Sequence, residues 1–417
     1  MTGPLSHLTV LDLSRVLAGP WCTQLLADLG ADVIKIEKPG SGDDTRTWGP
    51  PFLKGRDGRD TGEAAYYLGC NRGKKSVAID FTKPDGSKLV RDLAQTADIV
   101  VENFKVGGLA KYGLDYAGLA ALNARLVYCS ITGFGQTGPY AERAGYDFII
   151  QGMGGFMSVT GERDDLPGGG PQKAGIAIAD LMTGMYACSA ILAAVAHRDA
   201  GGPGQHIDVA LFDTQVAMMA VMNMNYLVSG KPPGRAGNAH PNIVPYQVFA
   251  CADGHLILAV GNDAQFARFC EVAGKPEWAR DPRFAQNAER VRRREELVPM
   301  IEAVMRTRAQ AAWLAALEAV GVPCGPINRL DQVFADPQVR ARRIRVDLPH
   351  PLSGTVPQVA NPLRFSKSPV AYTQAPPLLG EHTAAELSAR LGLSESALKE
   401  LAGRGVIQLA RGGETEQ

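Results

Sequence analysis

The sequence has no excess of charge of either sign and no clustered cysteines. Its 417 residues include 43 lysines and arginines against 43 aspartates and glutamates, so no net field favours nucleic acid or an anionic membrane. The seven cysteines are scattered without a C-x-x-C pair, which argues against a disulfide framework and against a zinc site. We therefore expect a small-molecule partner, a reducing compartment and no metal.

Long hydrophobic runs are also missing. No window reaches about 18 uninterrupted apolar residues, and the first residues, MTGPLSHLTVLDLS, lack a basic segment followed by a long apolar one. The sequence therefore predicts a cytoplasmic protein that has no membrane partner.

Several catalytic signatures do not occur. The loop SRVLAGP, which follows the first predicted strand, has one glycine and no G-x-G-x-x-G, so it does not suit the pyrophosphate of a nicotinamide dinucleotide. The sequence also lacks a P-loop, H-E-x-x-H and G-x-S-x-G. Nucleotide hydrolysis, metalloprotease and serine hydrolase chemistry therefore lack their residues.

What the sequence does contain is an alternation of short β-rich runs with helical patterns. We predict strands and helices in turn at 8–14, 19–29, 32–37, 75–80, 84–96, 98–104, 114–122 and 125–135. Such alternation implies crossover connections and an α/β fold with a doubly wound, mostly parallel sheet. Ligands of such sheets bind beyond the carboxyl ends of the strands.

Segments rich in glycine and proline punctuate the rest of the chain. We predict a large α/β domain over 1–225, a smaller inserted α+β domain over 226–328, and a return to the large domain over 329–417.

Basic residues gather in the loops after the predicted strands. They are Arg15, Lys38, Arg46, Arg72, Lys74, Lys75, Lys105 and Lys111. Side chains of this kind can hold a phosphate or a carboxylate, although each could equally belong to a solvated rim. From the residues alone, the sequence indicates an α/β enzyme with an anionic ligand.

Asp180 is a lone carboxylate in the apolar run GIAIADLMTGMYACSAILAAVA. It can cap the helix that begins there, by accepting from the N–H of Met182 or Thr183. It can also be a poorly hydrated nucleophile or base, which the helix N-terminus keeps ionised. The two interpretations are compatible. Tyr146, Asp147 and His240 are weaker candidates, since such residues are more often structural.

The order of motifs along the chain resembles that of class III CoA-transferases. They are VLDLSRVLAGPWCTQLLADLGADVIKIEKPGSGDDTR, LGCNRGKKSVAID, DIVVENFKVGGLAKYG, SITGFGQTGPYAERAGYD, GIAIADLMTGMYA, VALFDTQVAM, GVPCGPI and PPLLGEHT. The resemblance covers nearly the whole chain. It implies a large domain built from both chain ends, a small domain between them and two interlocked subunits in a homodimer.

The resemblance also implies a mechanism. An Asp at the position of Asp180 is the nucleophile, which forms first an anhydride with the acyl group and then a thioester with CoA. No cofactor is bound permanently, because CoA enters as a substrate. Tyr146 and Asp147 match a pair near the reacting carbonyl. The residues expected along CoA are Val16, Ala18, Lys38, Arg72, Lys75, Asn103, Phe104 and Lys111.

Within the family, the sequence looks most like the branch that uses succinyl-CoA and glutarate. Leu17 stands where the formate and oxalate branch has Gln, which argues against that substrate pair. A dicarboxylate leaves one carboxylate unreacted, and a closed site must pair that charge. Arg46, Arg143 and His240 are the candidates. The glycines Gly168–Gly170 would suit a loop that shields the intermediate.

Two other functions stay open. The related α-methylacyl-CoA racemases use a His and an Asp as paired acid and base, and their His falls where this chain has Tyr146. A phenol with a pKa near 10 is a poor base at neutral pH, which disfavours this alternative. An acyl-CoA-binding protein without turnover is the third possibility.

Overall fold

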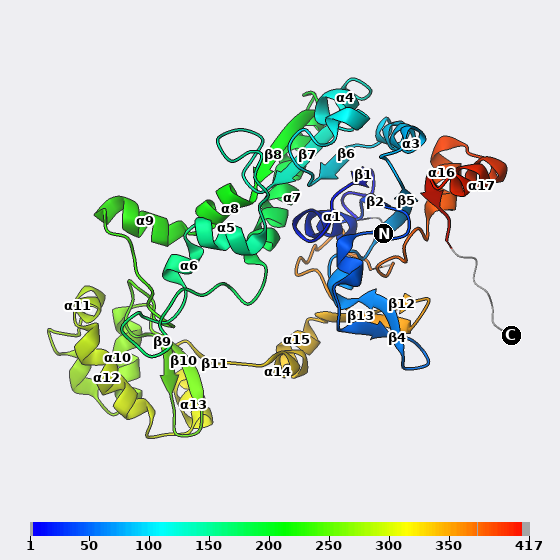
Figure 1. The fold of residues 1–417 in the computed structure, drawn as a ribbon. Helices are drawn as coiled ribbons and strands as arrows, with labels where there is room; N and C mark the ends of the chain where they lie inside the picture. Colours follow the sequence, from blue (N-terminus) through cyan, green and yellow to red (C-terminus); the bar gives the residue numbers. More distant parts are fainter. Residues whose placement is uncertain (1–2, 373, 411–417) are drawn as a thin grey trace. The chain divides into compact units, whose positions relative to one another are not determined.

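The computed structural model describes residues 3–372 and 374–410. The chain forms two compact units (Figure 1). The first unit contains Met1–Gly155, Ala174–Asn223 and Arg340–Gln417, and the second contains Phe156–Lys173 and Met224–Val339. The second unit therefore includes Phe156–Lys173, which the sequence analysis assigned to the large domain, and it ends eleven residues after 328.

The first unit is built on a seven-stranded sheet with the order β14-β5-β2-β1-β6-β7-β8. The strands are β1 (Thr9–Asp12), β2 (Asp32–Glu37), β5 (Lys74–Ile79), β6 (Ile99–Glu102), β7 (Val127–Thr132), β8 (Gln205–Ala210) and β14 (Ile407–Gln408). All neighbouring pairs are parallel except β14 with β5. The predicted mixed α/β fold with a mostly parallel sheet is confirmed.

The central strands are nearly continuous apolar runs because both faces of the sheet are covered. Val10, Val33, Val100 and Val127 have no exposed surface. One face packs against α1 (Ala18–Asp28) and α7 (Ile178–Asp199). The other face packs against the helices α3 (Pro84–Ala94), α4 (Tyr116–Ala120), α16 (Thr383–Leu391) and α17 (Glu395–Gly403).

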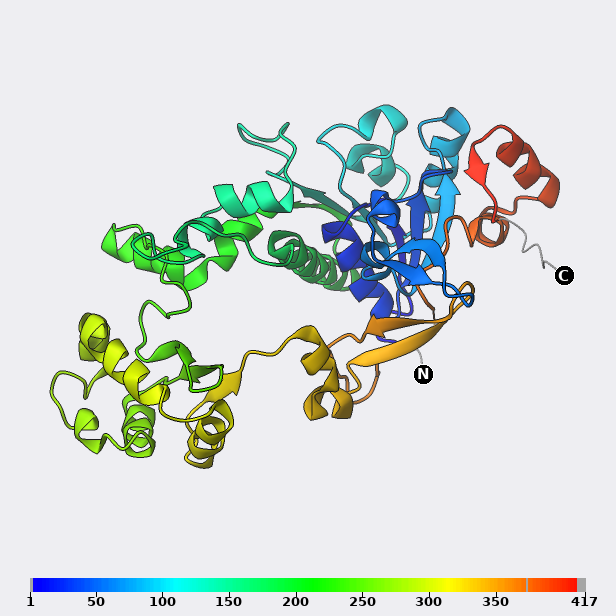
Figure 2. The same cartoon turned by 60° about the horizontal axis from the view of Figure 1, so that its bottom comes forward.

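The C-terminal end of the chain completes this second face. Helix α16 packs against α3 and β5, and β14 extends the sheet beside β5. In Figures 1 and 2 the C-terminal helices (red) lie beside these early elements (light blue). Leu387 and Leu398 from the C-terminal helices are buried in the same cluster as Leu89 and Val90 of α3. The first unit therefore needs both chain ends for its core.

Shorter elements surround the sheet in the first unit. They are the hairpins β3 (Phe52–Lys54) with β4 (Asp60–Ala64) and β12 (Arg345–His350) with β13 (Gly354–Val359), the helices α2 (Ala65–Leu68), α5 (Asp147–Met153) and α8 (Leu211–Met218), and the 3-10 turns η1 (Asp44–Thr47) and η2 (Ala110–Tyr112). Helix α9 (Ala220–Ser229) continues from the first unit into the second.

The second unit has its own core around a three-stranded antiparallel sheet with the order β11-β10-β9. Trp313, Phe249, Phe266 and Phe269 are buried in this core. Its elements are α6 (Phe156–Val159), β9 (Tyr246–Ala250), β10 (His255–Ala259), α10 (Asp263–Val272), η3 (Pro276–Ala279), α11 (Asn287–Arg292), α12 (Arg294–Met305), α13 (Gln310–Ala319), β11 (Cys324–Pro326) and α14 (Leu330–Ala335), followed by α15 (Pro337–Ala341) at its end.

Helix α7 is a long apolar helix of 22 residues. By length and composition it could cross a membrane, with a mean hydropathy of 1.6 over its most apolar window. It packs against α1, α8, β7 and β8, and this contact buries one side of it. The other side is exposed, with Met185 at 43% and Tyr186 at 47%.

Candidate active site

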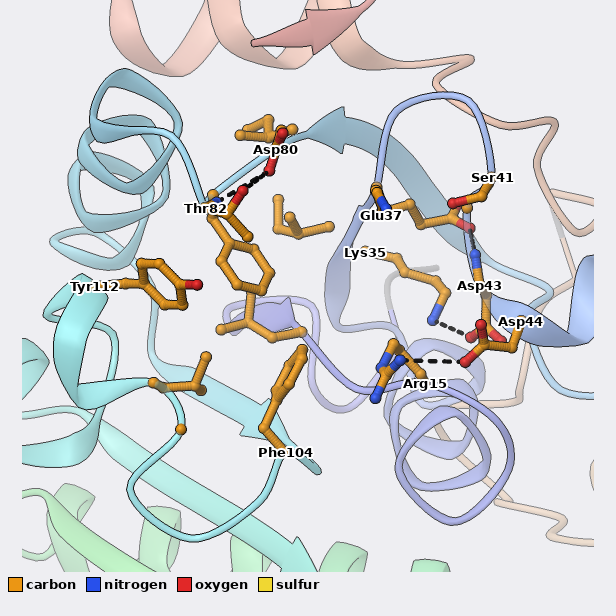
Figure 3. Close-up of a pocket in the computed structure, with 18 of the residues that line it drawn as sticks. Arg15, Lys35, Glu37, Ser41, Asp43, Asp44, Asp80, Thr82, Phe104 and Tyr112 are labelled. Carbon is orange, nitrogen blue, oxygen red and sulfur yellow. Dashed lines mark hydrogen bonds and ion pairs between the residues drawn. The ribbon is translucent and has the colours of Figure 1, made fainter. Parts of the chain in front are cut away.

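A cavity of about 510 Å³ lies over the carboxyl ends of β1, β2, β5 and β6 (Figure 3). This is where ligands bind in open α/β sheets. Leu13 follows β1, Lys38 follows β2, Phe81 follows β5 and Phe104 follows β6, so each strand contributes a side chain to the wall. Of these four residues, the sequence analysis singled out only Lys38 by loop position, and Leu13 and Phe104 lay at the ends of predicted strands.

The lining of this first cavity combines aromatic rings with cations. The ring of Phe81 contacts those of Phe104 and Tyr112 edge to face, with centroids 5.6 Å apart in both pairs. Within the described residues, Lys38 and Lys111 have no carboxylate partner. Apolar rings beside unpaired ammonium groups suit a ligand with a flat base and several phosphates.

Lys105 adds a third such ammonium group to the wall. It too has no carboxylate partner in the part of the chain that the structure describes. Three carboxylates of the wall pair with cations of the protein: Asp44 with Arg15 at 3.2 Å, Glu37 with Arg46 at 2.8 Å and Asp43 with Lys35 at 2.9 Å. The side chain of the fourth, Asp80, accepts from Thr82. Within the described residues, three unpaired lysines therefore face one carboxylate without a cation partner.

A second cavity of about 240 Å³ adjoins the first. Arg15, Asp44, Phe104 and Lys105 line both cavities, so the two cavities share a wall. Val16, Ala18, Asn103, Tyr146 and Asp180 line the second cavity. The carboxylate of Asp180 therefore belongs to the cavity next to the cationic one.

The turn between β1 and α1 forms one wall of the second cavity. Asn103 holds this turn through two hydrogen bonds: the N–H of Arg15 donates to Oδ1 over 2.9 Å, and Nδ2 donates to the Arg15 carbonyl over 2.6 Å. Asn103 was expected along CoA, and it also fixes the loop that lines the cavity.

Gly184 brings Asp180 close to this turn. A Cβ atom at Gly184 would lie 2.6 Å from the backbone oxygen of Ala18, so only glycine allows α7 to pack this tightly on the start of α1. Asp180 lies four residues before Gly184 and therefore faces the same side of the helix, one turn nearer its N-terminus.

Asp180 is not the cap of α7, so the predicted capping role was wrong. The helix begins at Ile178, and Asp180 lies within its first turn. Asp147 supplies the cap instead: Oδ1 accepts from the N–H of Ala179 over 2.8 Å and of Asp180 over 3.3 Å. Oδ2 of Asp147 in turn accepts from Gln151 Nε2 over 2.6 Å. The carboxylate of Asp180 is thus not used to cap the helix.

The environment of Asp180 raises its pKa to about 7, first through burial and second through the neighbouring carboxylate of Asp147. This outcome differs from the expectation that the helix N-terminus keeps the group fully ionised. Tyr66 on α2 lies close enough to Asp180 for the negative charge of Asp180 to affect its phenol. Burial first, and the charge of Asp180 second, raise the pKa of this phenol to about 12. Nothing in the sequence pattern singled out Tyr66.

The raised pKa predicts a pH dependence of the chemistry. The family resemblance makes Asp180 the nucleophile, and a carboxylate attacks only when ionised, so kcat/KM should fall about tenfold per pH unit below pH ~7 and reach a plateau above it. Initial rates between about pH 5.5 and about pH 8.5 would measure this. A flat profile over that range would contradict the combination of a raised pKa and a nucleophilic role for Asp180.

Arg46 does not lie free for a substrate, although it was a candidate for the distal carboxylate. Its side chain is 8% exposed, and its guanidinium pairs with Glu37 at 2.8 Å and Glu63 at 3.3 Å. It also donates to the hydroxyl of Tyr67 over 2.6 Å and to the carbonyl of Pro377 over 3.0 Å. Its donors are therefore used inside the protein.

Arg72 and Lys75 lie at the amino-terminal edge of the sheet, opposite the two cavities. Arg72 forms two bonds to Asp28, of 2.8 and 2.7 Å, and Lys75 pairs with Asp32 at 2.9 Å and Glu386 at 3.0 Å. The structure does not bring them together with the other residues expected along CoA.

Arg143 and His240 differ in placement. Arg143 lines the second cavity, and within the described residues it has no carboxylate partner; its guanidinium lies over the rings of Tyr140 and Phe134, at 4.6 and 5.3 Å. His240 belongs to the second unit, where burial lowers its pKa and its ring lies beside Tyr246. Tyr146 is 65% exposed and lines the second cavity.

Among the residues that the structure describes, no group of three or more His, Cys, Asp or Glu side chains could hold a metal ion. The site is instead built for an organic anion, with a cationic and aromatic cavity that leads to a carboxylate.

These features define an α/β protein with a cationic and aromatic cavity over its strand ends and a carboxylate in the adjoining cavity. A family model described as CoA-transferase family III matches residues 5–383. The chain belongs to this family and is an enzyme that transfers CoA, with CoA thioesters as substrates. The predicted resemblance is confirmed.

Curated relatives match almost the whole chain. A succinate–glutarate CoA-transferase from Agrobacterium fabrum is 55% identical over 385 residues, which cover 92% of this chain and 95% of the relative. The human succinyl-CoA:glutarate CoA-transferase is 41% identical over a match that covers 97% of this chain and 90% of the human protein. The crystal structure of a CaiB/BaiF family protein from Brucella suis matches with a TM-score of 0.82 at 51% identity. The match covers 94% of this chain and 100% of the Brucella chain.

Proposed function

We propose that this enzyme transfers CoA from succinyl-CoA to a dicarboxylate such as glutarate, with Asp180 as the covalent nucleophile. The observation that carries the proposal is the position of Asp180 in a cavity that shares a wall with the cationic and aromatic cavity. The names of the 55% and 41% identical relatives support the substrate pair.

The first half of the reaction forms two covalent intermediates. A carboxylate oxygen of Asp180 attacks the thioester carbonyl carbon; the C–S bond breaks, CoA leaves as the thiolate, and a mixed anhydride remains. The thiolate then attacks the aspartyl carbonyl of this anhydride, which releases succinate and leaves an aspartyl–CoA thioester. No proton is gained or lost in either step.

The second half runs the same steps in reverse. A carboxylate of the acceptor attacks the aspartyl–CoA thioester, which gives a new anhydride and CoA thiolate. The thiolate then attacks the acceptor's carbonyl carbon, and Asp180 leaves as a carboxylate. Because a carboxylate is a weak nucleophile, the rate depends on the fixed position of Asp180 and on the exclusion of water.

The two cavities match the parts of acyl-CoA. The aromatic cluster of Phe81, Phe104 and Tyr112 suits the adenine, and the unpaired ammonium groups of Lys38 and Lys111 suit the phosphates. The narrower second cavity then receives the thioester beside Asp180.

Arg143 is the group we assign to the unreacted carboxylate of the dicarboxylate. It lines the cavity of Asp180, and within the described residues no carboxylate neutralises it. A guanidinium can bind a carboxylate through two parallel hydrogen bonds. Arg46 cannot take this role because its donors are already bonded.

The apolar surface of the first unit supports a homodimer. Exposed apolar side chains gather on α5, α7, α8 and the segment before α7, namely Phe148, Ile149, Met153, Ile176, Met185, Tyr186 and Val216. Exposed apolar patches of this kind mark interfaces. We propose that a second copy of the chain covers them, as the resemblance to interlocked dimers implies.

The experiment that tests the function is a product assay. The enzyme is mixed with succinyl-CoA and glutarate, and acyl-CoA species are separated by chromatography and identified by mass. We expect glutaryl-CoA and succinate in equal amounts. Exchange of the α-proton of a 2-methylacyl-CoA in deuterated water, without any transfer, would instead support the racemase alternative.

A further inference from the structure

A buried polar network lies beneath the turn between β1 and α1. Asp12, Lys35 and Lys74 have no exposed surface, and Asp43 is 1% exposed. Burying four charges costs several kcal/mol of solvation for each ion, and apolar residues of similar volume often stabilise a core equally well. The network therefore calls for a role beyond stability.

The two lysines hold the two ends of the turn. Nζ of Lys35 donates to the carbonyl of Ser14 over 2.8 Å, and Nζ of Lys74 donates to the carbonyl of Pro20 over 2.9 Å. Lys74 also pairs with Asp12 at 3.1 Å. The two buried ammonium groups thus fix both ends of the segment that lines the second cavity.

Asp12 completes the hold on the first end of the turn. Its Oδ1 accepts from the N–H of Ser14 over 2.9 Å and from the Ser14 hydroxyl over 2.5 Å. Its Oδ2 accepts from the hydroxyl of Thr23 on α1 over 2.6 Å.

Asp43 holds the middle of the turn, where the backbone is strained. Val16 has φ +71°, a conformation that a β-branched residue adopts only when its surroundings impose it. Its N–H points at the carboxylate of Asp43, 3.2 and 3.3 Å from the two oxygens. Lys35 pairs with the same carboxylate at 2.9 Å, as Figure 3 shows.

The carboxylate of Asp43 stays charged in this setting. Burial alone would raise its pKa, but Lys35 and the N–H and hydroxyl of Thr45 lower the pKa to about 2. The N–H of Val16 therefore faces a full negative charge at every pH at which the enzyme works.

We propose that Asp43, backed by Lys35, is a positioning residue for CoA transfer, which holds Val16 in its left-handed conformation so that the turn presents a fixed wall to the thioester beside Asp180. The inference rests on the proposed function. Asp43 itself pairs with the protein and acts on the reaction through the turn.

The test compares Asp43→Asn with a matched control, Asp98→Asn. Asp98 also accepts a backbone N–H, from Thr9 over 2.9 Å, and pairs with a buried cation, Arg198, at 2.9 Å, but it lies before β6 at the amino-terminal edge of the sheet. We expect Asp43→Asn to lower kcat at least about tenfold, because a small misplacement of the substrate is costly. The dissociation constant of CoA, measured by calorimetry, should change less than about threefold.

Asp98→Asn should leave kcat within about twofold of the native value, even if it unfolds at lower temperature. Equal kcat values for the two variants would overturn the proposal. If Asp43→Asn does not fold, Asp43→Glu replaces it in the kcat comparison. Glutamate keeps the negative charge, but its longer side chain displaces this charge from the N–H of Val16. A native kcat in folded Asp43→Glu would also overturn the proposal.

A double-mutant cycle with Val16→Gly tests the role of the strained turn directly. Glycine adopts a positive φ without strain, so the turn no longer needs Asp43 to hold it. In the Val16→Gly background, Asp43→Asn should lower kcat less than about twofold, and additive losses would contradict the proposal. If the native enzyme itself transfers no CoA, the proposed function fails instead, and the two failures are thereby distinguished.

Discussion

Replacing Asp180 with asparagine will abolish CoA transfer while the protein stays folded. Asparagine has nearly the same shape as aspartate but no anionic oxygen, so neither the anhydride nor the thioester can form. We expect kcat for glutaryl-CoA formation to fall at least about a thousandfold, as for other lost nucleophiles. The product assay with purified Asp180→Asn measures this.

The same variant should be more stable than the native protein above pH ~7. Burial, aided by Asp147, raises the pKa of Asp180 to about 7 in the folded protein, from an ordinary value of 3.8. A raised pKa stabilises the fold at low pH, and this contribution is lost as the pH rises toward about 7. Asparagine removes the cost of the buried charge, so the Tm at pH ~8 should rise.

Asp199→Asn is the control for both measurements. Asp199 ends the same helix and pairs with Arg198 at 3.1 Å, far along α7 from the cavities. Its replacement should leave transfer unchanged. Substantial transfer by Asp180→Asn, at a rate that contamination with native enzyme does not explain, would remove Asp180 from the mechanism.

Replacing Arg143 with glutamine will reduce the use of dicarboxylates selectively. The variant loses the cation that we assign to the distal carboxylate, which leaves that charge unpaired in the cavity. We expect kcat/KM for glutarate to fall about a hundredfold, since hydrogen bonds to charged groups contribute about 1.5–3 kcal/mol. A monocarboxylate such as butyrate, which has no distal charge, should lose far less.

Arg125→Gln is the matched control for Arg143→Gln. Arg125 is exposed and pairs loosely with Asp199 at 3.8 Å, away from the cavities. Steady-state rates with both acceptors would show whether the loss depends on the second carboxylate. An equal loss of kcat/KM for glutarate and butyrate would show that Arg143 supports the structure of the loop and does not recognise the distal carboxylate.

The sheet was predictable because its strands are buried on both faces and read as short apolar runs. The prediction 32–37 coincides with β2, and 8–14, 98–104 and 125–135 each contain one observed strand. The position of the cavities follows from the same pattern, since parallel strands align their carboxyl ends. Lys38 and Lys111, singled out by loop position, line the first cavity, whereas Phe104 also lines it but was expected along CoA only from the family resemblance.

The parts that the sequence could not reveal depend on contacts between distant residues. The cap of α7 comes from Asp147, 33 residues before Asp180, whereas a local capping rule considers only neighbours. A basic residue in a loop looks the same whether it is free, like Arg143, or paired in the interior, like Arg46. The strain at Val16 and its contact with Asp43 likewise arise only in the fold.

The most direct test of the account is the mass of the enzyme after it is mixed with succinyl-CoA. Intact-protein mass spectrometry, followed by a hydroxylamine or borohydride challenge and peptide mapping, locates any covalent species. We predict a CoA adduct, or its trapped product, on the peptide that contains Asp180, and none in Asp180→Asn. An unmodified enzyme that still produces glutaryl-CoA, or an adduct on another residue, would contradict the covalent role of Asp180.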